Sequence, residues 1–221
     1  MAVQVKICGL TRPEDADAVL RAGADFAGLV FHPGSPRHLR PGQAAAIARA
    51  LRAKVRVVAL LADPTDAELS DAVAAADPDW IQLHGRESPA RVAHVRSRFG
   101  RPVIKTLAIA EDADFAPLDS YHAVADMLLF DAKPPAGAER AGGHGRAFDW
   151  QLLRGRTIRK PWLLAGGLHA GNVGRARAAS GAQGVDVSSG VESPAGVKDA
   201  EAIAAFAIAA RAADVPQEVP A

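Results

Sequence analysis

The amino-acid sequence predicts a single (β/α)8 barrel, and three observations support that prediction. Short apolar runs alternate with Ala-rich, charged stretches of helical character along the chain. The alternation repeats about eight times, at a spacing of about 25 residues. The chain has 221 residues, and barrels of about 200 to 250 residues form one domain. Strand–helix alternation implies a parallel sheet with right-handed crossovers. Eight units favour a closed barrel, and an open, doubly wound sheet is the alternative.

The expected elements follow that alternation in order. The first strand covers 3–8 and the first helix 13–22, with Thr11 as its cap and Pro13 in its first turn. The later strands are expected at 26–31, 56–61, 80–83, 103–106, 127–131, 162–165 and 184–187. The later helices are expected at 43–52, from about 66, from about 89, near 112, at 172–179 and at 201–212.

One unit departs from this pattern. After Asp131 the chain is rich in Pro and Gly, which predicts a long loop before Phe148. Long loops in compact domains often bind ligands or cover a site. The barrel is expected to occupy residues 1–213, and the segment 214–221 is expected to be a disordered tail.

Composition narrows the class of protein. Lys and Arg number 26 and Asp and Glu 25, a formal net charge of +1. This balance gives no long-range field for nucleic acid or for a membrane, although a small anionic substrate needs only a few local donors. A single cysteine excludes an internal disulfide. With no signal-peptide pattern and no long apolar run, we expect a soluble cytoplasmic protein.

The sequence also speaks against a metal or a nucleotide cofactor. Neither a G-x-G-x-x-G nor a G-x-x-x-x-G-K-[ST] motif occurs. Five histidines show no metal-ligand spacing and are expected at the surface: His32, His38, His94, His122 and His169.

Polar side chains fall on strand faces where a barrel should be apolar. In the first strand, Val3, Val5 and Ile7 share the face expected to lie under helices. Lys6 and Cys8 share the other face and must therefore point into the barrel. The same alternation turns further polar residues inward near the ends of later strands: Gln82, His84, Asp131, Asp186 and Ser188. Barrel active sites are built at those ends. The alternative is that each is a solvated strand-end residue.

Two of these residues are candidates for acid–base chemistry. A thiol, with a pKa of about 8.5, can serve as a base where its site favours the thiolate, which makes Cys8 a candidate base. Asp131 is a candidate acid if burial or a like charge keeps it protonated. The alternatives are a small core residue for Cys8 and an ordinary strand-to-loop residue for Asp131.

Other residues suit anions. The strand ends Ala165-Gly166-Gly167 and Ser188-Ser189-Gly190 combine close backbone approach with hydroxyl donors, as phosphate sites do, although glycine also serves tight turns. Arg37 follows a loop stiffened by Pro33 and Pro36, and its guanidinium suits a carboxylate. As an exposed loop residue it is expected to add little to stability; the alternative is a solvated surface arginine.

Lys6 needs a partner if it lies inside the barrel. Closure makes the last strand the neighbour of the first, so we expect an ion pair with Asp186, or with Asp131. The ammonium would then favour the thiolate of Cys8. The alternative is that Lys6 turns outward to solvent between helices.

These residues resemble motifs of the phosphoribosylanthranilate isomerase family of tryptophan biosynthesis. The matches run in order over nearly the whole chain, and the ordered set is far more specific than any one motif. They are Lys6-Ile7-Cys8-Gly9-Leu10-Thr11, Phe31-His32-Pro33-Gly34-Ser35-Pro36-Arg37, Gln82-Leu83-His84-Gly85, Phe130-Asp131, Phe148-Asp149-Trp150, Leu164-Ala165-Gly166-Gly167-Leu168, Asp186-Val187-Ser188-Ser189-Gly190-Val191-Glu192 and Lys198-Asp199.

The resemblance implies an Amadori rearrangement of N-(5-phosphoribosyl)anthranilate to 1-(2-carboxyphenylamino)-1-deoxyribulose 5-phosphate. It implies Cys8 as general base, Asp131 as general acid and Arg37 on the anthranilate carboxylate. It implies no cofactor and no metal, and a monomer or a homodimer. The other expected substrate-binding residues are Lys6, Gln82, His84 and Asp186. The expected phosphate-binding residues are Gly143, Gly145, Gly166, Gly167, Ser188, Ser189 and Gly190.

The sequence departs from the family pattern in places, and two other functions remain open. Gly142-Gly143-His144-Gly145, Ala132 and Ala147 lack hydroxyls that the family often has there, which puts in doubt contacts with the ligand. One alternative is a related barrel that acts on the analogous aminoaldose of histidine biosynthesis. That enzyme should carry a second phosphate site, and His84-Gly85-Arg86 is not a convincing one. The other alternative is a phosphosugar-binding protein without catalysis.

Overall fold

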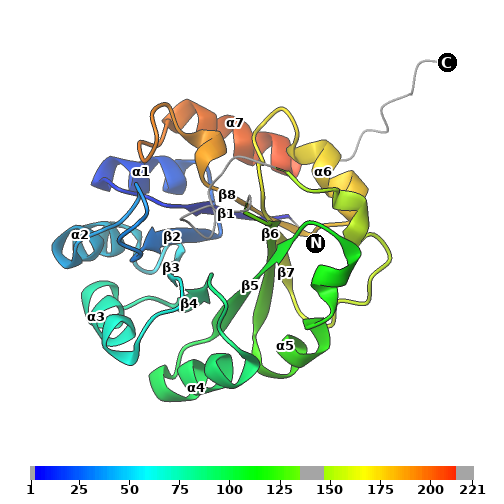
Figure 1. The fold of residues 1–221 in the computed structure, drawn as a ribbon. Coiled ribbons are helices and arrows are strands. Elements are labelled where there is room, and N and C mark those ends of the chain that lie inside the picture. Colours follow the sequence, from blue (N-terminus) through cyan, green and yellow to red (C-terminus); the bar gives the residue numbers. More distant parts are fainter. Residues whose placement is uncertain (1–2, 135–146, 213–221) are drawn as a thin grey trace.

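Eight parallel strands close into a barrel. The computed structural model describes residues 3–134 and 147–212. Each strand is hydrogen-bonded to the next, and β8 is hydrogen-bonded to β1. Figure 1 shows the strands as an inner ring surrounded by helices. The strands are β1 (Gln4–Cys8), β2 (Phe26–Val30), β3 (Arg56–Leu61), β4 (Trp80–Leu83), β5 (Val103–Ile109), β6 (Met127–Ala132), β7 (Trp162–Leu164) and β8 (Gly184–Val187).

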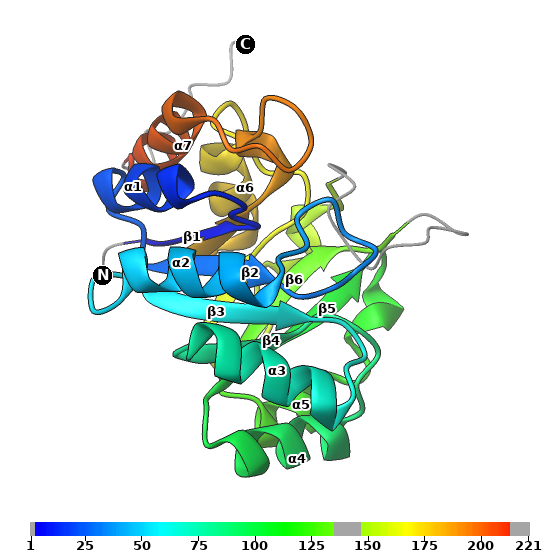
Figure 2. The same ribbon diagram turned by 90° about the vertical axis from the view of Figure 1, so that its left-hand side faces the viewer.

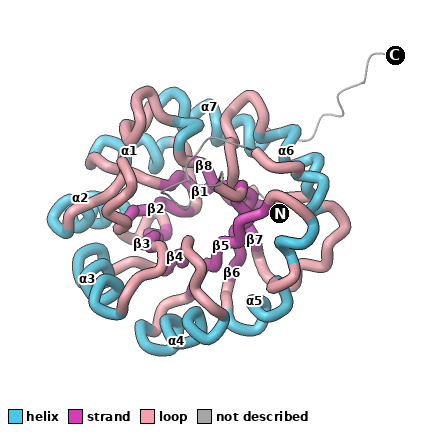
Figure 3. The backbone as a smooth tube through the Cα atoms, in the orientation of Figure 1, coloured by secondary structure: helices cyan, strands magenta, loops and turns pink. Residues whose placement is uncertain are grey.

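Helices follow the strands and form the outer layer (Figure 3). In the side view of Figure 2, α2 and α3 lie in front of the strands that they cover. The α-helices are α1 (Pro13–Arg21), α2 (Pro41–Leu51), α3 (Asp66–Ala76), α4 (Pro89–Phe99), α5 (Leu118–Val124), α6 (Val173–Ser180) and α7 (Ala200–Arg211). Three short 3-10 helices are η1 (Asp112–Phe115), η2 (Trp150–Leu153) and η3 (Ser189–Val191). The closed barrel is therefore confirmed, and the open sheet is excluded by the β8–β1 pairing.

Strand alternation separates two apolar layers. The outer faces of the strands pack with the helices in one large cluster, to which Val5 and Ile7 belong. The inner faces form a smaller cluster inside the barrel that includes Phe26, Ile104 and Leu129. The inward phase expected for Lys6 and Cys8 follows from this division, because they alternate with Val5 and Ile7 along β1.

One local expectation is wrong, and one helix was not predicted. The N-cap of α1 is Arg12 instead of Thr11. The carboxylate of Asp15 accepts hydrogen bonds from the amides of both Thr11 and Arg12, and the Thr11 hydroxyl donates to the Gly196 carbonyl at 2.6 Å. The short helix expected near 112 is η1, and α5, which follows it with Pro117 as its N-cap, was not predicted. Proline has no amide N–H to continue the hydrogen bonding of a preceding helix.

One expected surface histidine is buried. His122 lies in α5 with 6% of its surface exposed. Its Nε2 accepts a hydrogen bond from the Arg159 amide at 3.3 Å, and its Nδ1 lies 3.3 Å from Asp119 Oδ1. These partners satisfy both ring nitrogens, which is why the ring can be buried. Of the other four histidines, His32 is partly exposed and the rest are exposed.

The two ends of the described chain meet at one carboxylate. Asp25, in the turn before β2, accepts a hydrogen bond from the Val5 amide at 2.8 Å. Arg211, the last residue of α7, lies 3.5 Å from the same oxygen and donates to the carbonyls of Ala22 and Gly23. Residues 214–221, expected to form a tail, lie outside the described residues. No described helix has the length and apolarity that a bilayer span requires.

Candidate active site

The inward polar residues lie at the C-terminal ends of the strands. Lys6 is bound to Asp186 of the neighbouring strand, with 2.8 Å between Nζ and Oδ1. The two residues are register partners across the β1–β8 closure. Lys6 is fully buried. Burial lowers the pKa of Lys6, but Asp186 and Cys8 outweigh burial and raise it above its ordinary value. The predicted Lys6–Asp186 pair is therefore confirmed, and Lys6 does not turn outward.

Cys8 ends β1 inside the barrel. It packs with Val30 and Leu60 and has 4% of its surface exposed. A Cβ on Gly28, its neighbour on β2, would lie 2.7 Å from the Cys8 sulfur, so a glycine there leaves room for the thiol. Burial raises the pKa of Cys8, and the charge of Lys6 opposes that rise without overcoming it. Lys6 lowers the pKa of Cys8, as expected, but in the free protein Cys8 is still a thiol at neutral pH.

Asp131 is held at the end of β6. Its Oδ1 accepts a hydrogen bond from the amide of Ala132 at 2.8 Å, and its Oδ2 lies 3.4 Å from Nε2 of His84. Gly166 lies beside this carboxylate with a φ of +88°. A Cβ there would lie 2.8 Å from the Ala132 amide, so the loop after β7 approaches Asp131 closely only because it has glycine at this point.

A hydrogen-bond network orients His84 toward Asp131. The Gln82 amide nitrogen lies 3.0 Å from His84 Nδ1 and donates to the Thr106 hydroxyl at 3.1 Å. That hydroxyl lies 3.2 Å from His84 Nδ1. Because an amide NH2 can only donate, it makes Nδ1 an acceptor and leaves the proton on Nε2, which faces Asp131. Thr106 was not predicted from the sequence, although it lies two residues after Ile104 on β5 and shares its inward face.

Arg37 differs from expectation in its exposure. It is buried, and its guanidinium makes a two-pronged ion pair with Glu192, with Nε–Oε1 at 2.7 Å and Nη2–Oε2 at 2.8 Å. No described residue hydrogen-bonds its Nη1, so the Glu192 pair leaves this nitrogen unused. Lys198 binds the same carboxylate at 2.6 Å. Burial alone would raise the pKa of Glu192, but Arg37 and Lys198 lower it to about 2. No role of Glu192 or Lys198 was predicted from the sequence.

The two glycine-rich strand ends lie together. Gly166 and Gly167 have positive φ angles, and the Asn172 side chain holds the Gly167 carbonyl at 2.9 Å. A side chain on Gly190 would collide with the Leu168 carbonyl, so the loops after β7 and β8 pack against each other. Ser188 and Ser189 complete this corner. Gly143 and Gly145, and His144 between them, lie outside the described residues.

A further buried ion pair supports the loop after β4. Lys105 lies on the outer face of β5 and binds Glu87 at 2.6 Å. Its ammonium also donates to the Gly85 carbonyl at 2.7 Å. Glu87 in turn accepts hydrogen bonds from the amides of Asp63 and Gly85. This pair fixes the chain that follows His84, although neither charge lies inside the barrel.

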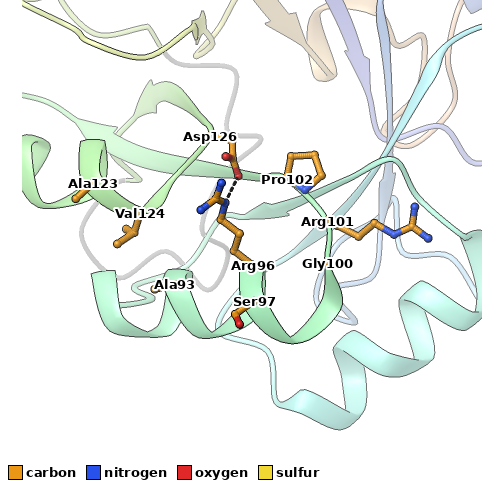
Figure 4. Close-up of a pocket in the computed structure, with 9 residues that line it drawn as sticks. All are labelled: Ala93, Arg96, Ser97, Gly100, Arg101, Pro102, Ala123, Val124 and Asp126. Carbon is orange, nitrogen blue, oxygen red and sulfur yellow. Dashed lines mark hydrogen bonds and ion pairs between the residues drawn. The ribbon is translucent and has the colours of Figure 1, made fainter.

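A cavity of about 550 Å³ opens at the other end of the barrel. It lies beside the end of α4 and the turns that lead into β5 and β6, and Figure 4 shows Arg96 directed at Asp126 there. The two are 2.9 Å apart, and the cavity's other arginine, Arg101, pairs with Asp77. This cavity is separate from the residues at the C-terminal ends of the strands. No three His, Cys, Asp or Glu side chains in 3–134 and 147–212 are grouped to hold a metal ion.

Comparison with known proteins identifies the family. A family model described as N-(5'phosphoribosyl)anthranilate (PRA) isomerase matches residues 5–209. The N-(5'-phosphoribosyl)anthranilate isomerase of Rhodopseudomonas palustris (strain BisA53) is 53% identical over 214 residues, which are 97% of this chain and 98% of that protein. The structure of phosphoribosyl anthranilate isomerase from Thermotoga maritima matches with a TM-score of 0.84 and 33% identity, over 94% of this chain and 98% of that one.

A further solved structure contains a ligand. It is a phosphoribosyl anthranilate isomerase in complex with reduced 1-(o-carboxyphenylamino)-1-deoxyribulose 5-phosphate. It matches with a TM-score of 0.81 and 32% identity, and the match covers 94% of this chain and 98% of that chain. The likeness therefore extends over nearly the whole chain in both sequence and fold, and the chain belongs to the N-(5'-phosphoribosyl)anthranilate isomerase family.

Proposed function

We propose that this chain catalyses the Amadori rearrangement of N-(5-phosphoribosyl)anthranilate to 1-(2-carboxyphenylamino)-1-deoxyribulose 5-phosphate in tryptophan biosynthesis. The observation that carries the proposal is the pair of groups inside the barrel, a buried thiol on β1 and a carboxyl on β6 beside His84. The homologue bound to a reduced form of the same aminoketose phosphate supports the choice of substrate.

The proposed chemistry uses Asp131 first and Cys8 second. Asp131 gives its proton to the ring oxygen of the ribose, the C1′–O bond breaks, and a protonated Schiff base forms at C1′. The thiolate of Cys8, formed when the thiol proton passes to solvent, then removes the C2′ proton, and the electron pair moves to give the neutral enolamine, which tautomerises to the ketone. C1′ is reduced and C2′ is oxidised within one molecule, so the reaction is an intramolecular oxidoreduction that needs no external electron acceptor.

The charge of the intermediate explains how a buried thiol can act as a base. Burial raises the pKa of Cys8 in the free protein. The protonated Schiff base places a positive charge next to the C2′ carbon from which Cys8 takes its proton. A nearby cation favours the thiolate. The positive charge of the Schiff base therefore favours the thiolate form of Cys8 at the step that requires it.

The two anionic ends of the substrate are proposed to bind on either side of the ribose. The Arg37 Nη1, which the Glu192 pair leaves unused, suits the anthranilate carboxylate. The corner made by Gly166, Gly167 and the serines after β8 suits the phosphate. Holding both ends fixes the ribose between acid and base, which lowers the entropy cost of the reaction.

One observation speaks against a second phosphate site at the end of β4. The Gly85 amide donates to Glu87, and the Arg86 amide donates to Asp63 Oδ1 at 2.6 Å. Two carboxylates thus occupy the amides that a phosphate would use and add negative charge there. The second aminoaldose considered from the sequence is therefore not proposed as a substrate.

The test is turnover of freshly generated phosphoribosylanthranilate, followed by its fluorescence. Cys8→Ser and Asp131→Asn should each lower kcat by about 10² or more, because each removes one general acid–base group. Both substitutions conserve size, so circular dichroism melting should show a folded barrel. A folded Cys8→Ser variant with wild-type kcat would remove the base from Cys8, and the same result for Asp131→Asn would place the acid elsewhere.

A further inference from the structure

The loop between β8 and α7 brings two charged side chains back to the mouth of the barrel. Glu192 and Lys198 face each other in an antiparallel bridge, and we call this segment the 192–198 loop. The Gly196 amide donates to Glu192 at 3.0 Å inside the loop. From outside, the Thr11 hydroxyl binds the Gly196 carbonyl, and Arg12 binds the Lys198 carbonyl at 2.8 Å. The loop is thus fixed to the chain that follows β1.

The Lys198 ammonium is buried in this arrangement. Its side chain is 1% exposed. It donates to the Ser188 carbonyl at 3.0 Å and to the Ser188 hydroxyl at 3.3 Å, and it lies 2.6 Å from Glu192 Oε1. That carboxylate is already bound at both oxygens by Arg37. Two cations therefore share one carboxylate.

The neighbouring charges do not balance this excess. Lys6 and Asp186 form a separate one-to-one pair. The five charges of the two groups are three cations, Lys6, Arg37 and Lys198, and two carboxylates, Asp186 and Glu192. One positive charge remains in excess while Cys8 is a neutral thiol. Burial lowers the pKa of Lys198 despite Glu192, as expected for a cation whose counter-ion is shared.

Cys8 lies next to this cluster, because a Cβ on Gly9, the residue that follows it, would lie 2.5 Å from Cδ of Arg37 and 3.1 Å from the Ser188 hydroxyl that Lys198 binds. Burial raises its pKa, Lys6 and Lys198 lower it, and Asp186 raises it. Gly28 of β2, Val30 and Leu60, which pack on the thiol, carry no charge. The charged groups that act on Cys8 are Lys6 of β1, Asp186 of β8, Lys198 of the 192–198 loop and Arg37 after β2.

We propose that Lys198 is a positioning residue for catalysis, whose excess positive charge stabilises the thiolate of Cys8. When the thiol loses its proton, the cluster becomes neutral, and a neutral cluster is the favoured state in a buried site. Without Lys198 the same step would leave a net negative charge. The proposal rests on the proposed role of Cys8 as the base. It adds Lys198, which is remote from Cys8 in the sequence, to Lys6 as a cation that favours the thiolate.

The experiment is a direct titration of the thiol. The chain has one cysteine, so the ultraviolet absorbance of the thiolate reports Cys8 without substrate. The one tyrosine also absorbs on ionisation, and its signal is removed by subtracting the titration of Cys8→Ser. We expect Lys198→Met to raise the Cys8 pKa by about one unit, the usual effect of losing a nearby opposite charge. Lys198→Arg keeps the charge and should keep the Cys8 pKa close to that of the wild type.

The outcomes separate a charge effect from a structural one. Lys198→Gln can still donate a hydrogen bond to Ser188 but has no charge, and it should show the same rise as Lys198→Met. It also replaces Lys198→Met if that variant does not fold. An unchanged Cys8 pKa in the uncharged variants would overturn the proposal, as would an equal rise in Lys198→Arg. Normal turnover in Cys8→Ser would overturn the proposed function. The titration uses no substrate, so its result on the effect of Lys198 on the Cys8 pKa does not depend on that assay.

Discussion

At the residue scale, the charged groups at the mouth of the barrel are paired with one another and are largely shielded from water. Glu192 accepts hydrogen bonds from Arg37, Lys198 and the Gly196 amide. Gly196 and Lys198 lie in the 192–198 loop with Glu192, whereas Arg37 lies 155 residues away in the chain. A carboxylate bound in this way holds the Nε and Nη2 edge of the Arg37 guanidinium in place. Its ionisation is therefore part of the stability of the fold as well as of the site.

The carboxyl group of Glu192 should contribute to stability in acid. Its pKa is about 2 in the folded protein, below its usual 4.5, so its contribution is complete above about pH 4.5 and is lost as the pH falls toward 2. Glu192→Gln should lower the free energy of unfolding by about 3 kcal/mol at neutral pH, because it leaves two buried cations without their counter-ion.

Urea unfolding over a series of pH values measures this effect. The difference between wild type and Glu192→Gln should shrink between about pH 4.5 and pH 2. Glu14→Gln, at an exposed position in α1, is the matched control and should leave the curve nearly unchanged. A difference between wild type and Glu192→Gln that stays constant over that range would show that Glu192 is not the titrating group.

The sequence could predict the site residues that regular alternation places. Lys6, Cys8, Asp131 and Asp186 alternate with apolar neighbours on strands, and a period of two turns them inward. The exposure of Arg37 could not be predicted, because its burial depends on Glu192, which lies after the last strand. Residues in loops have no such period, and only their distant partners determine where their side chains point.

At the element scale, a charged residue on an outer strand face supports the loop after β4. Lys105 breaks the apolar pattern expected under the helices, since it alternates with the inward Ile104 and Thr106. It is tolerated because Glu87 and the carbonyls of Leu83 and Gly85 satisfy its ammonium. The pair lies beyond His84 and determines the path of the chain there.

Removing one partner of this pair should destabilise the barrel strongly. Lys105→Met leaves Glu87 buried and unpaired, and we expect a loss of about 3 to 5 kcal/mol. The double variant Lys105→Met/Glu87→Gln removes both charges. Its loss in the free energy of unfolding should be smaller than the sum of the losses in the two single variants. Thermal or urea unfolding of all four proteins measures this coupling, and strictly additive losses would contradict it.

Element boundaries were predictable where the sequence contains strong signals. The strand runs are short and largely apolar and alternate with helical stretches, so each of the eight was located from the sequence. The segment between β5 and β6 was not, because Pro117 divides one weak helical pattern into η1 and α5. Short helices give few turns from which a period can be recognised.

At the scale of the whole molecule, one pairing decides between two architectures. Alternating strands and helices fit both an open parallel sheet and a closed barrel. The β1–β8 ladder closes the barrel, and the Lys6–Asp186 ion pair lies directly across it. This pairing joins residues 180 apart in the chain. The sequence favoured closure through the number of units and could not show the contact itself.

Because β1 and α7 both contact Asp25, a single added linker could close the chain into a ring. A circular permutant could join residue 212 to residue 3 through a short flexible linker and begin instead in the exposed turn between α2 and β3, near Lys54. Every strand pairing would survive this change, and β1 would become an internal segment. We expect the permutant to melt cooperatively and to retain turnover, because its new ends lie at the N-terminal end of the strands, away from Cys8 and Asp131. A permutant that folds but loses turnover would show that the order of the chain, as well as its closed form, determines how the mouth is arranged.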